Sequence, residues 1–522
     1  MKYLFHSLIS LLLLSSCNSI ESDLGFVSIE GQKFLDTKGR QIILHGVNLV
    51  NKDPKVNYLG DETIEDFAKM RQWGFNCVRL GIIWSGLEPE PGFYNEQYLQ
   101  GIDKRIRWAK ENNLYVILDM HQDLYSVLFS DGAPEWATIT DGHIFEKGQT
   151  VWSDAYFTSS AVQTAWDHFW ANTSASDGVG IQDHYAKAWQ HVANRYYAET
   201  TVVGYDLMNE PFLGSEAMQI FPAMLSKGAE LLSQIPGIGT PSVEELAYKW
   251  TTHEGRFEIL QILSDISLYK QVVDAAFPIY NLFEKNKLMG MYNRVAQAIR
   301  SVDKNHILFL ETTMGSNMGL YTGIEPVLDE NGNRDLLQAY APHGYDLVTD
   351  TKFVASPNFD RIQFIFNRHN ETTQRLNMPT LVGEWGAYGN HVNTLAAAQN
   401  VVQQFETNHF GDTYWDFSKG MEKLDHFKGI CRPIPLHVAG ELMSYSHNPN
   451  ERTFECKWEE DDKINYPTLI YIPSWMSLSE DNIHIEPAAM YKIVPITKGS
   501  NNLIIELPSL KETIVRNVAI SY

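Results

Sequence analysis

Two glutamates in this chain each follow an apolar, strand-like stretch. Glu210 lies in the motif NEP at 209–211, and Glu384 lies in the motif GEWG at 383–386. Cleavage of a glycosidic bond needs one carboxyl group that protonates the leaving oxygen and a second that attacks or stabilises the anomeric carbon. The pair therefore predicts glycoside hydrolysis. The alternative is that both glutamates only cap the ends of strands.

From residue 42 onward, strand-like runs alternate with helical ones, a pattern typical of parallel strands joined by crossover helices. The predicted strands cover residues 42–49, 76–82, 115–119, 202–207, 306–310, 336–341, 380–383 and 412–416. Eight such units predict a (β/α)8 TIM barrel. The fourth and seventh strands face each other across the mouth of such a barrel, so Glu210 and Glu384 could meet over one bond.

We expect an α/β protein with a catalytic barrel at 18–429 and a β-sandwich at 430–522, where short β-type runs alternate with turns. Two insertions follow strand ends, where barrel enzymes build their sites. The first, at about 124–181, is rich in aromatic residues and is expected to wall the cleft. The second, at about 213–287, has helical periodicity. It fits either an extra helical layer on the barrel or an apolar lip beside the site.

The chain carries 64 acidic and 41 basic residues, a formal net charge of −23. A field of that sign opposes the approach of a polyanion, so the composition argues against nucleic acid as a partner. We find no metal-ligand spacing, and we expect neither a metal nor another cofactor. Cys77 lies in an apolar run and is expected to be a small buried hydrophobe, whereas Cys431 and Cys456 could form a disulfide in an exported protein.

The N-terminus has the order of a secretory signal. Lys2 precedes the apolar run 8–14, which is too short to span a bilayer. Residues 14–17 read Leu-Ser-Ser-Cys and resemble the bacterial lipobox. The resemblance implies a signal peptide at 1–17, acylation of Cys17, export across the bacterial inner membrane, and anchorage to a membrane of the cell envelope or cell surface. The alternative is an ordinary signal peptide with an incidental cysteine.

Several motifs resemble those of glycoside hydrolase family 5, in clan A. They are the two glutamate motifs, Arg79 on the second predicted strand, and the run His-Gly-Tyr at 343–345. The finer pattern resembles the endoglycoceramidases of that family, in residues 45–52, 119–123, 132–137 and 204–212. The resemblance runs from about Val27 into the predicted sandwich. The resemblance ends at the insertion after Phe212, which is longer and more helical than the family pattern. Of all the properties that the resemblance implies, aglycone specificity is therefore the least defined.

The resemblance implies a retaining mechanism in which Glu210 is the acid/base and Glu384 the nucleophile. Asn209 would bond the 2-hydroxyl of the sugar, and Arg79 and Tyr345 would hold Glu384 ionised and oriented. The charge of Glu384 would in turn raise the pKa of Glu210 and keep that carboxyl protonated until it acts.

Further residues would bind the sugar. By the same resemblance, Lys52, His121 and Asp123 would hold the hydroxyls of the sugar next to the scissile bond. Trp415 would form the platform beneath that sugar, and His343 would lie close to the nucleophile. A surface lysine, a strand-end histidine and a core tryptophan are the structural alternatives.

The resemblance implies hydrolysis of the β-linkage between oligosaccharide and ceramide in glycosphingolipids. One alternative is the same chemistry on a polysaccharide, as in a family 5 endo-β-glucanase or mannanase. Another is hydrolysis of a glucosylceramide or steryl glucoside. A non-catalytic glycan-binding lipoprotein belongs to a different class, and the intact pair of Glu210 and Glu384 argues against it.

Overall fold

The computed structural model describes residues 24–522 except 236, 238 and 240. The predicted signal peptide at 1–17, and Cys17 with it, lie outside the described residues. Within the described part of the chain, no helix combines the length and the apolar character that crossing a membrane requires.

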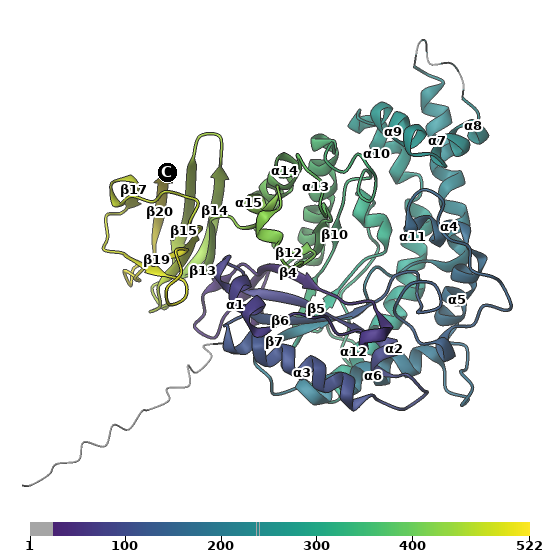
Figure 1. Cartoon of the computed structure of the whole chain (residues 1–522), viewed down its shortest axis with the longest axis horizontal. Helices are drawn as coiled ribbons and strands as arrows, with labels where there is room; N and C mark the ends of the chain where they lie inside the picture. The colour runs from purple at the N-terminus through teal and green to yellow at the C-terminus, as the bar shows by residue number, and fades with distance from the viewer. Residues whose placement is uncertain (1–23, 236, 238, 240) are drawn as a thin grey trace, which may run out of the picture.

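A nine-stranded parallel sheet forms the centre of the molecule (Figure 1). Its spatial order is β10-β11-β12-β4-β5-β6-β7-β8-β9. The strands are β4 (His45–Leu49), β5 (Cys77–Ile83), β6 (Tyr115–His121), β7 (Val202–Asp206), β8 (Ile307–Leu310), β9 (Gln338–Tyr340), β10 (His343–Gly344), β11 (Leu381–Gly386) and β12 (Gly411–Trp415). Each pairs in parallel with its neighbours, and the predicted TIM-barrel fold is confirmed.

The predicted sixth strand is interrupted. Pro342 separates β9 from β10 because proline has no N–H to donate to the ladder. A bridge between Tyr340 and Thr380 and a hydrogen bond from the Gly383 N–H to the Pro342 carbonyl join the two ends of the sheet. These contacts close the barrel, so β9 and β10 together occupy one place in the ring.

Helices cover the outside of the barrel and present one apolar face to it. They are α1 (Ile64–Gln72), α3 (Glu96–Glu111), α6 (Ile181–Tyr196), α12 (Met289–Arg300), α13 (Phe359–Leu376) and α14 (Leu395–Asn408). In α3 the side chain of Asn95 caps the first turn by accepting from the Tyr98 N–H. Leu99, Ile102 and Ile106 then recur at helical spacing and are buried.

The first insertion packs mostly into the core. It contains α4 (Ala155–Thr158) and α5 (Ser160–Trp170), and its residues Tyr156, Trp166 and Phe169 are fully buried. Only part of the expected aromatic wall reaches the cleft, namely Phe129, Phe145, Trp152 and Phe157. Aromatic side chains of this size bury a large area, so packing them into the core stabilises the fold more than leaving them exposed to stack on a ligand.

The second insertion is helical, as predicted, and forms a lobe that projects beside the barrel mouth (Figure 1). Its helices are α7 (Ile220–Leu232), α8 (Val243–Trp250), α9 (His253–Ile262), α10 (Ile266–Asp274) and α11 (Phe277–Phe283). Leu232, Leu246 and Ile259 form an apolar cluster of their own, separate from the main core.

Two antiparallel sheets complete the fold. The seven-stranded sheet has the order β1-β2-β3-β13-β16-β19-β18 and the four-stranded sheet the order β14-β15-β20-β17. Their strands are β1 (Ser28–Glu30), β2 (Lys33–Leu35), β3 (Gln41–Ile42), β13 (Ile434–Val438), β14 (Gly440–Asn448), β15 (Thr453–Glu460), β16 (Thr468–Ile472), β17 (Ile483–Glu486), β18 (Lys492–Pro495), β19 (Leu503–Leu507) and β20 (Ile514–Ser521). In β15, Phe454, Cys456 and Trp458 alternate inward with outward charged residues.

The N-terminal strands differ from the prediction. Residues 42–49 were expected to form one barrel strand, but Ile42 belongs to β3 and pairs with His437 of β13, and the barrel strand begins at His45. The chain thus starts in the C-terminal sheet before it enters the barrel. The thiols of Cys77, Cys431 and Cys456 are free and buried, so the disulfide between Cys431 and Cys456 does not form.

Candidate active site

The two glutamates meet at the carboxyl ends of opposite barrel strands. Glu210 follows β7 and Glu384 lies in β11, and each side chain is nearly buried. One carboxylate oxygen of each, and one ring nitrogen of His343, lie within 4.8 Å of one another. Retaining glycosidases hold their carboxyl groups about 5 Å apart, whereas inverting enzymes need roughly 6.5–9.5 Å to admit a water. The spacing therefore fits a double displacement through a glycosyl-enzyme.

Arg79 is the fixed positive charge beneath this pair. It lies in β5, is fully buried, and forms ion pairs with four carboxylates. These are Asp119 at 3.0 Å, Asp206 at 2.9 Å, Glu311 at 2.7 Å and Glu384 at 3.0 Å. Because the guanidinium is planar and always charged, it holds several carboxylates in one defined geometry. Arg79 therefore fixes the orientation of Glu384 relative to the strands around it.

Tyr345 supplies the second contact to Glu384. Its hydroxyl donates to Glu384 Oε2 at 3.0 Å, while Arg79 Nη1 donates to Oε1 at 3.0 Å. Gly383 precedes the glutamate, and a side chain there would approach His343 Nε2 at 3.1 Å. The glycine therefore lets the imidazole pack directly against the strand that carries Glu384.

Glu210 is held by three groups from other parts of the barrel. Its backbone has a φ of 42°, in the left-handed region, and its N–H donates to Glu311 Oε2 at 2.7 Å. Its Oε1 accepts hydrogen bonds from Asn317 Nδ2 at 2.7 Å and from His343 Nδ1 at 2.9 Å. A strained conformation of this kind persists only where its surroundings fix it. Here Glu311 fixes the backbone, and Asn317 and His343 fix the carboxylate.

The proton distribution in this site differs from the expectation. Burial alone would raise the pKa of Glu210, but the hydrogen bonds from His343 and Asn317 lower it below its usual range. Burial raises the pKa of Glu384 to about 8. Burial opposes the charge of His343, yet Glu311 and Glu384 raise its pKa well above the usual range, so the ring is an imidazolium. The directions of the Glu210 and Glu384 shifts are opposite to the expected order, in which Glu210 is the member of the pair with the raised pKa.

His343 lies between the two carboxylates. Its Nδ1 is 2.9 Å from Glu210 Oε1 and 3.6 Å from Glu384 Oε2. The sequence placed this histidine beside the nucleophile, and the structure brings it closer to the acid/base. A proton can be redistributed between the carboxylates through the imidazole without any change in the total number of bound protons.

Asn209 precedes Glu210 in the chain, and its side chain is held by two neighbours. Its Oδ1 accepts from Arg79 Nη2 at 2.9 Å, and its Nδ2 donates to the Gln122 carbonyl at 3.0 Å. One amide hydrogen of Nδ2 remains for a ligand. Bonding to the 2-hydroxyl of a sugar stays a prediction.

The residues assigned to sugar binding lie together on one side of the pair. Lys52 forms an ion pair with Asp123, and its ammonium lies 4.9 Å above the centre of the Trp415 ring. His121 stacks on the same tryptophan at 5.3 Å between ring centres, and its Nδ1 contacts Asp119 at 2.8 Å. Burial lowers the pKa of His121 well below its usual range, so the ring is neutral. A cation, a carboxylate, a neutral imidazole and an indole face together suit the hydroxyls and the faces of a sugar.

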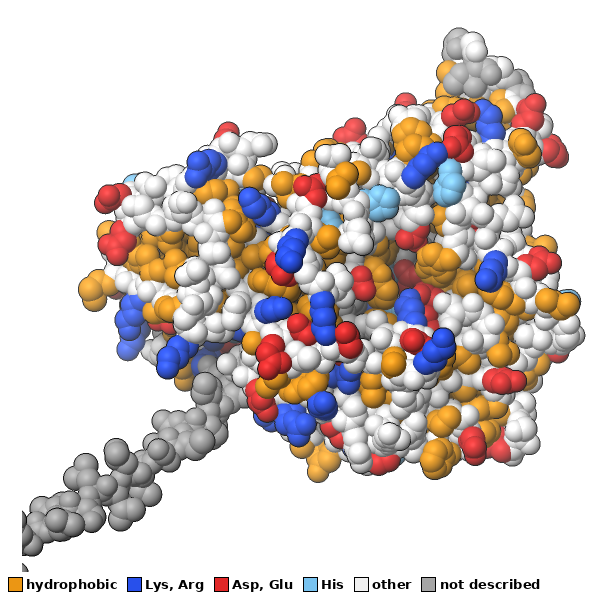
Figure 2. All heavy atoms as spheres, viewed as in Figure 1, with side chains coloured by type: hydrophobic (Ala, Val, Ile, Leu, Met, Phe, Trp, Pro, Cys, Tyr) orange, Lys and Arg blue, Asp and Glu red, His pale blue; other side chains and the backbone are white. Residues whose placement is uncertain are grey.

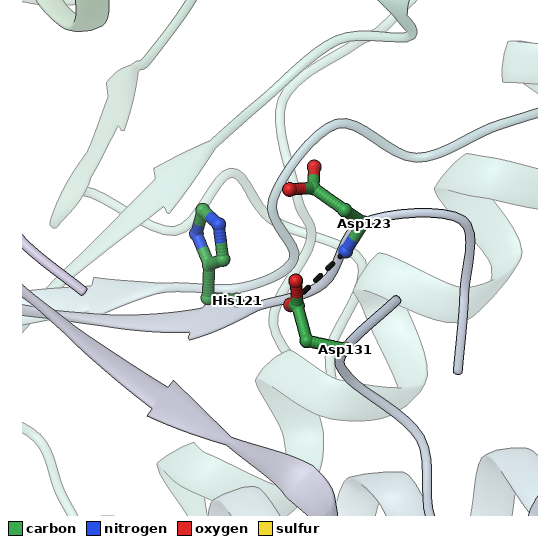
Figure 3. A group of neighbouring side chains, drawn as sticks. All are labelled: His121, Asp123 and Asp131. Carbon is green, nitrogen blue, oxygen red and sulfur yellow. Dashed lines mark hydrogen bonds between the residues drawn. The ribbon is translucent and has the colours of Figure 1, made fainter. Parts of the chain in front are cut away.

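In the part of the chain that the structure describes, three clusters of acidic and histidine side chains lie close enough together to hold a metal ion, and one of them is drawn in Figure 3. In this cluster the Asp123 N–H donates to Asp131 Oδ1 at 3.1 Å beside His121. The ammonium of Lys52 already contacts both aspartates of this cluster. Arg79 does the same for Asp119, Asp206 and Glu311 in the second, and His343 belongs to the third together with Glu210 and Glu384. Cationic side chains thus compensate these carboxylates.

A cavity of about 700 Å³ joins these groups to the helical lobe. Its polar part contains Glu210, Glu384 and the sugar-binding cluster. The rest of its lining includes a run of apolar side chains, Phe157, Phe221, Met224 and Trp250, beside polar ones such as Arg256 and Asp350. Figure 2 shows a hollow in this face of the molecule with acidic and apolar side chains around it. Of the two interpretations of the second insertion, the apolar lip beside the active site is the one that the geometry supports.

The model of the family described as "Cellulase (glycosyl hydrolase family 5)" matches residues 35–420 of this chain. The chain belongs to glycoside hydrolase family 5. The model of the glycoside hydrolase family 5 C-terminal domain matches residues 432–516. The two matches account for the barrel and for most of the two antiparallel sheets.

Among family 5 relatives, the chain is 29% identical to an endoglycoceramidase from Hydra vulgaris over 98% of this chain and 92% of that protein. The structure of endo-glycoceramidase II from Rhodococcus sp. in complex with ganglioside GM3 matches with a TM-score of 0.70 and 25% identity. That match covers 94% of this chain and 100% of the other. The lactosyl-enzyme intermediate of the same enzyme matches with a TM-score of 0.68 and 26% identity, over 94% and 99% of the two chains.

Two residues of this family 5 site escaped the assignment from sequence. Glu311 directly follows β8, so its place at the catalytic edge was visible, but its role in holding the Glu210 backbone was not. Asn317 lies in the short helical turn η6 (Met314–Met318), beyond any strand end. A loop residue of this kind carries no periodic signal, and only the fold brings it to Glu210.

Proposed function

We propose that this family 5 enzyme hydrolyses the β-glycosidic linkage between the oligosaccharide and the ceramide of glycosphingolipids, with retention of configuration. The observation that carries the proposal is the single cavity that has catalytic carboxylates and polar sugar-binding groups in one part and an apolar wall in another. The likeness to endoglycoceramidases over nearly the whole chain supports the same substrate class.

The geometry accounts for each step. Glu384, oriented by Arg79 and Tyr345, attacks the anomeric carbon while Glu210 protonates the oxygen of the leaving ceramide. The carboxylate of Glu384 becomes an ester of the sugar, and Glu210 becomes a carboxylate. Glu210 then removes a proton from water, which attacks the anomeric carbon and releases both the oligosaccharide and the Glu384 carboxylate.

The apolar wall distinguishes this proposal from polysaccharide hydrolysis. A polysaccharide cleft would use a row of exposed tryptophans as platforms. All thirteen tryptophans lie in the described part of the chain, and Trp152 alone among them counts as exposed, at 40%. Trp415 and Trp250 line the cavity but are only partly exposed. The arrangement favours an amphiphilic substrate over a long neutral polymer.

Incubation with lactosylceramide in detergent micelles tests the proposal, with glucosylceramide, soluble β-glucan and β-mannan as parallel substrates. We expect intact lactose and ceramide from lactosylceramide. A Glu210→Gln variant serves as the inactive control. Turnover of β-glucan or β-mannan without cleavage of either glycolipid would refute the proposal, and cleavage of glucosylceramide alone would restrict it to monosaccharide lipids.

We further propose that Cys17 carries the lipid anchor and that the enzyme acts at a membrane of the bacterial envelope. The sequence Leu-Ser-Ser-Cys at 14–17 supports this proposal, and an anchor would hold the enzyme where its amphiphilic substrate is concentrated. Expression of the full chain with labelled palmitate tests it. We expect labelled, membrane-bound enzyme and loss of the label in Cys17→Ala. Equal membrane association without label in both forms would contradict it.

A further inference from the structure

The helical lobe contains a second, apolar cavity of about 60 Å³. Its lining residues come from α7, α8, α9 and α10, together with Leu347 from the loop after β10. Tyr269 and Trp250 are the two side chains among them that carry a polar group, and the Tyr269 hydroxyl already donates to the Met318 carbonyl at 2.7 Å. A cavity whose exposed surface is apolar gains nothing from water or from a sugar, and it suits a hydrocarbon.

The apolar cavity adjoins the catalytic cavity. Four residues line both: Phe221, Met224, Trp250 and Leu347. These four side chains lie between the scissile bond and the interior of the lobe. A flexible chain attached to the leaving oxygen at Glu210 could pass along them.

Gly228 leaves this cavity open. It lies in the interior of α7, where glycine is the least favourable helix former after proline. Its backbone does not need a glycine, because the residue is helical and has no positive φ. A Cβ at this position would meet Leu246 at 3.8 Å and Val272 at 4.0 Å, which is ordinary van der Waals contact. The fold would accept a side chain here, yet the space is empty.

We propose that the cavity beside Gly228 binds one alkyl chain of the lipid aglycone. The inference rests on the proposed function and adds to it a defined chain-binding site inside the second insertion. The volume admits the end of an alkyl chain and excludes a sugar ring with its hydroxyls. The site therefore makes the enzyme sensitive to the length of that chain, independently of the glycan.

Gly228→Leu tests the inference because it fills the cavity with a better helix former. The substrates are a lactosyl lipid with a long N-acyl chain, the same lipid with an N-acetyl group, and a soluble aryl β-lactoside. For the long-chain lipid we expect kcat/KM to fall by about tenfold or more. For the other two we expect values within about twofold of wild type, with a melting temperature that is equal or higher.

Gly290→Leu provides the matched control. Gly290 lies in α12, is exposed, and a Cβ there would meet nothing within 4 Å. We expect this variant to keep the wild-type preference. Leu246→Ala widens the cavity from the opposite wall and should shift the optimum toward bulkier chains, which keeps the test decisive if Gly228→Leu does not fold.

An unchanged ratio of long-chain to N-acetyl activity in Gly228→Leu, or equal losses on all three substrates, would overturn the inference. Cleavage of both lipids by the wild type in that experiment would leave the proposed function standing. If the wild type cleaves the aryl lactoside but neither lipid, the proposed function itself fails. The two failures are therefore distinguishable.

Discussion

Replacement of Asn317 by alanine is expected to raise the pKa of Glu210 and so to reduce the fraction of the ionised carboxylate, which acts as the base. The amide of Asn317 donates to Glu210 Oε1 at 2.7 Å, and this contact lowers the pKa of the carboxyl. A hydrogen bond to a charged group contributes about 1.5–3 kcal/mol. The protonated carboxyl still accepts a neutral hydrogen bond of about 0.5–1.5 kcal/mol, so the amide favours the ionised form by about 1–1.5 kcal/mol. Since about 1.4 kcal/mol corresponds to a factor of ten, Asn317→Ala reduces the ratio of ionised to protonated Glu210 by roughly 5- to 10-fold.

A dinitrophenyl β-lactoside isolates the step that needs this base. Its leaving group departs without protonation, so hydrolysis of the glycosyl-enzyme, in which Glu210 activates water, limits turnover. We expect the acid limb of the kcat profile of Asn317→Ala to move toward neutral pH. At acidic pH the loss should approach the factor above, while kcat on the plateau stays close to that of wild type.

Asn408→Ala is the control for this measurement. Asn408 ends α14 on the outside of the barrel, and its side chain donates to the Gln404 carbonyl at 2.8 Å. The variant also loses one asparagine hydrogen bond but should keep the wild-type pH profile. An acid limb in Asn317→Ala that coincides with that of wild type would refute the role given to this contact.

Four further outcomes follow from the structure. The profile of kcat/KM is expected to be bell-shaped, falling above pH about 8 as Glu384 loses the proton that the pair needs, and a rate still rising at pH 9 would contradict this. Lys52→Met leaves Asp123 and Asp131 uncompensated and should destabilise the fold by about 3 kcal/mol in denaturant titrations, whereas the same change at the exposed Lys55 should have little effect. Trp189→Ala, in the core, should cost about 3–5 kcal/mol by the same assay. Asp412, with its pKa lowered to about 2 by Arg432 and His45 against the effect of burial, stabilises the fold above pH about 4, and this contribution should disappear between pH about 4 and 2.

The barrel was predictable from sequence because its strands are continuous buried runs that alternate with helical segments. Residues 76–82 and 115–119 correspond to β5 and β6 with only small differences at the ends. The break at Pro342 and the pairing of Ile42 with His437 were not predictable in the same way. The first depends on how the ring closes, and the second joins segments almost four hundred residues apart, for which local periodicity carries no information.

The catalytic pair could be assigned from its motifs, but its electrostatics could not. Burial, charge and hydrogen bonds decide where a proton lies, and these depend on neighbours from several strands. Contact with His343 and Asn317 reverses the expected order of the two pKa values. Turnover requires the arrangement in which Glu210 holds the proton and Glu384 is ionised.

The central claim is that Glu384 forms the covalent bond to the sugar. The enzyme is incubated with dinitrophenyl 2-deoxy-2-fluoro-β-lactoside, and the labelled peptide is sequenced by mass spectrometry, which tests this claim directly. The account predicts a single fluorolactosyl ester on Glu384, which is lost when Glu384 is replaced by Gln. A label on Glu210 or Glu311, or continued turnover without any trapped ester, would contradict it.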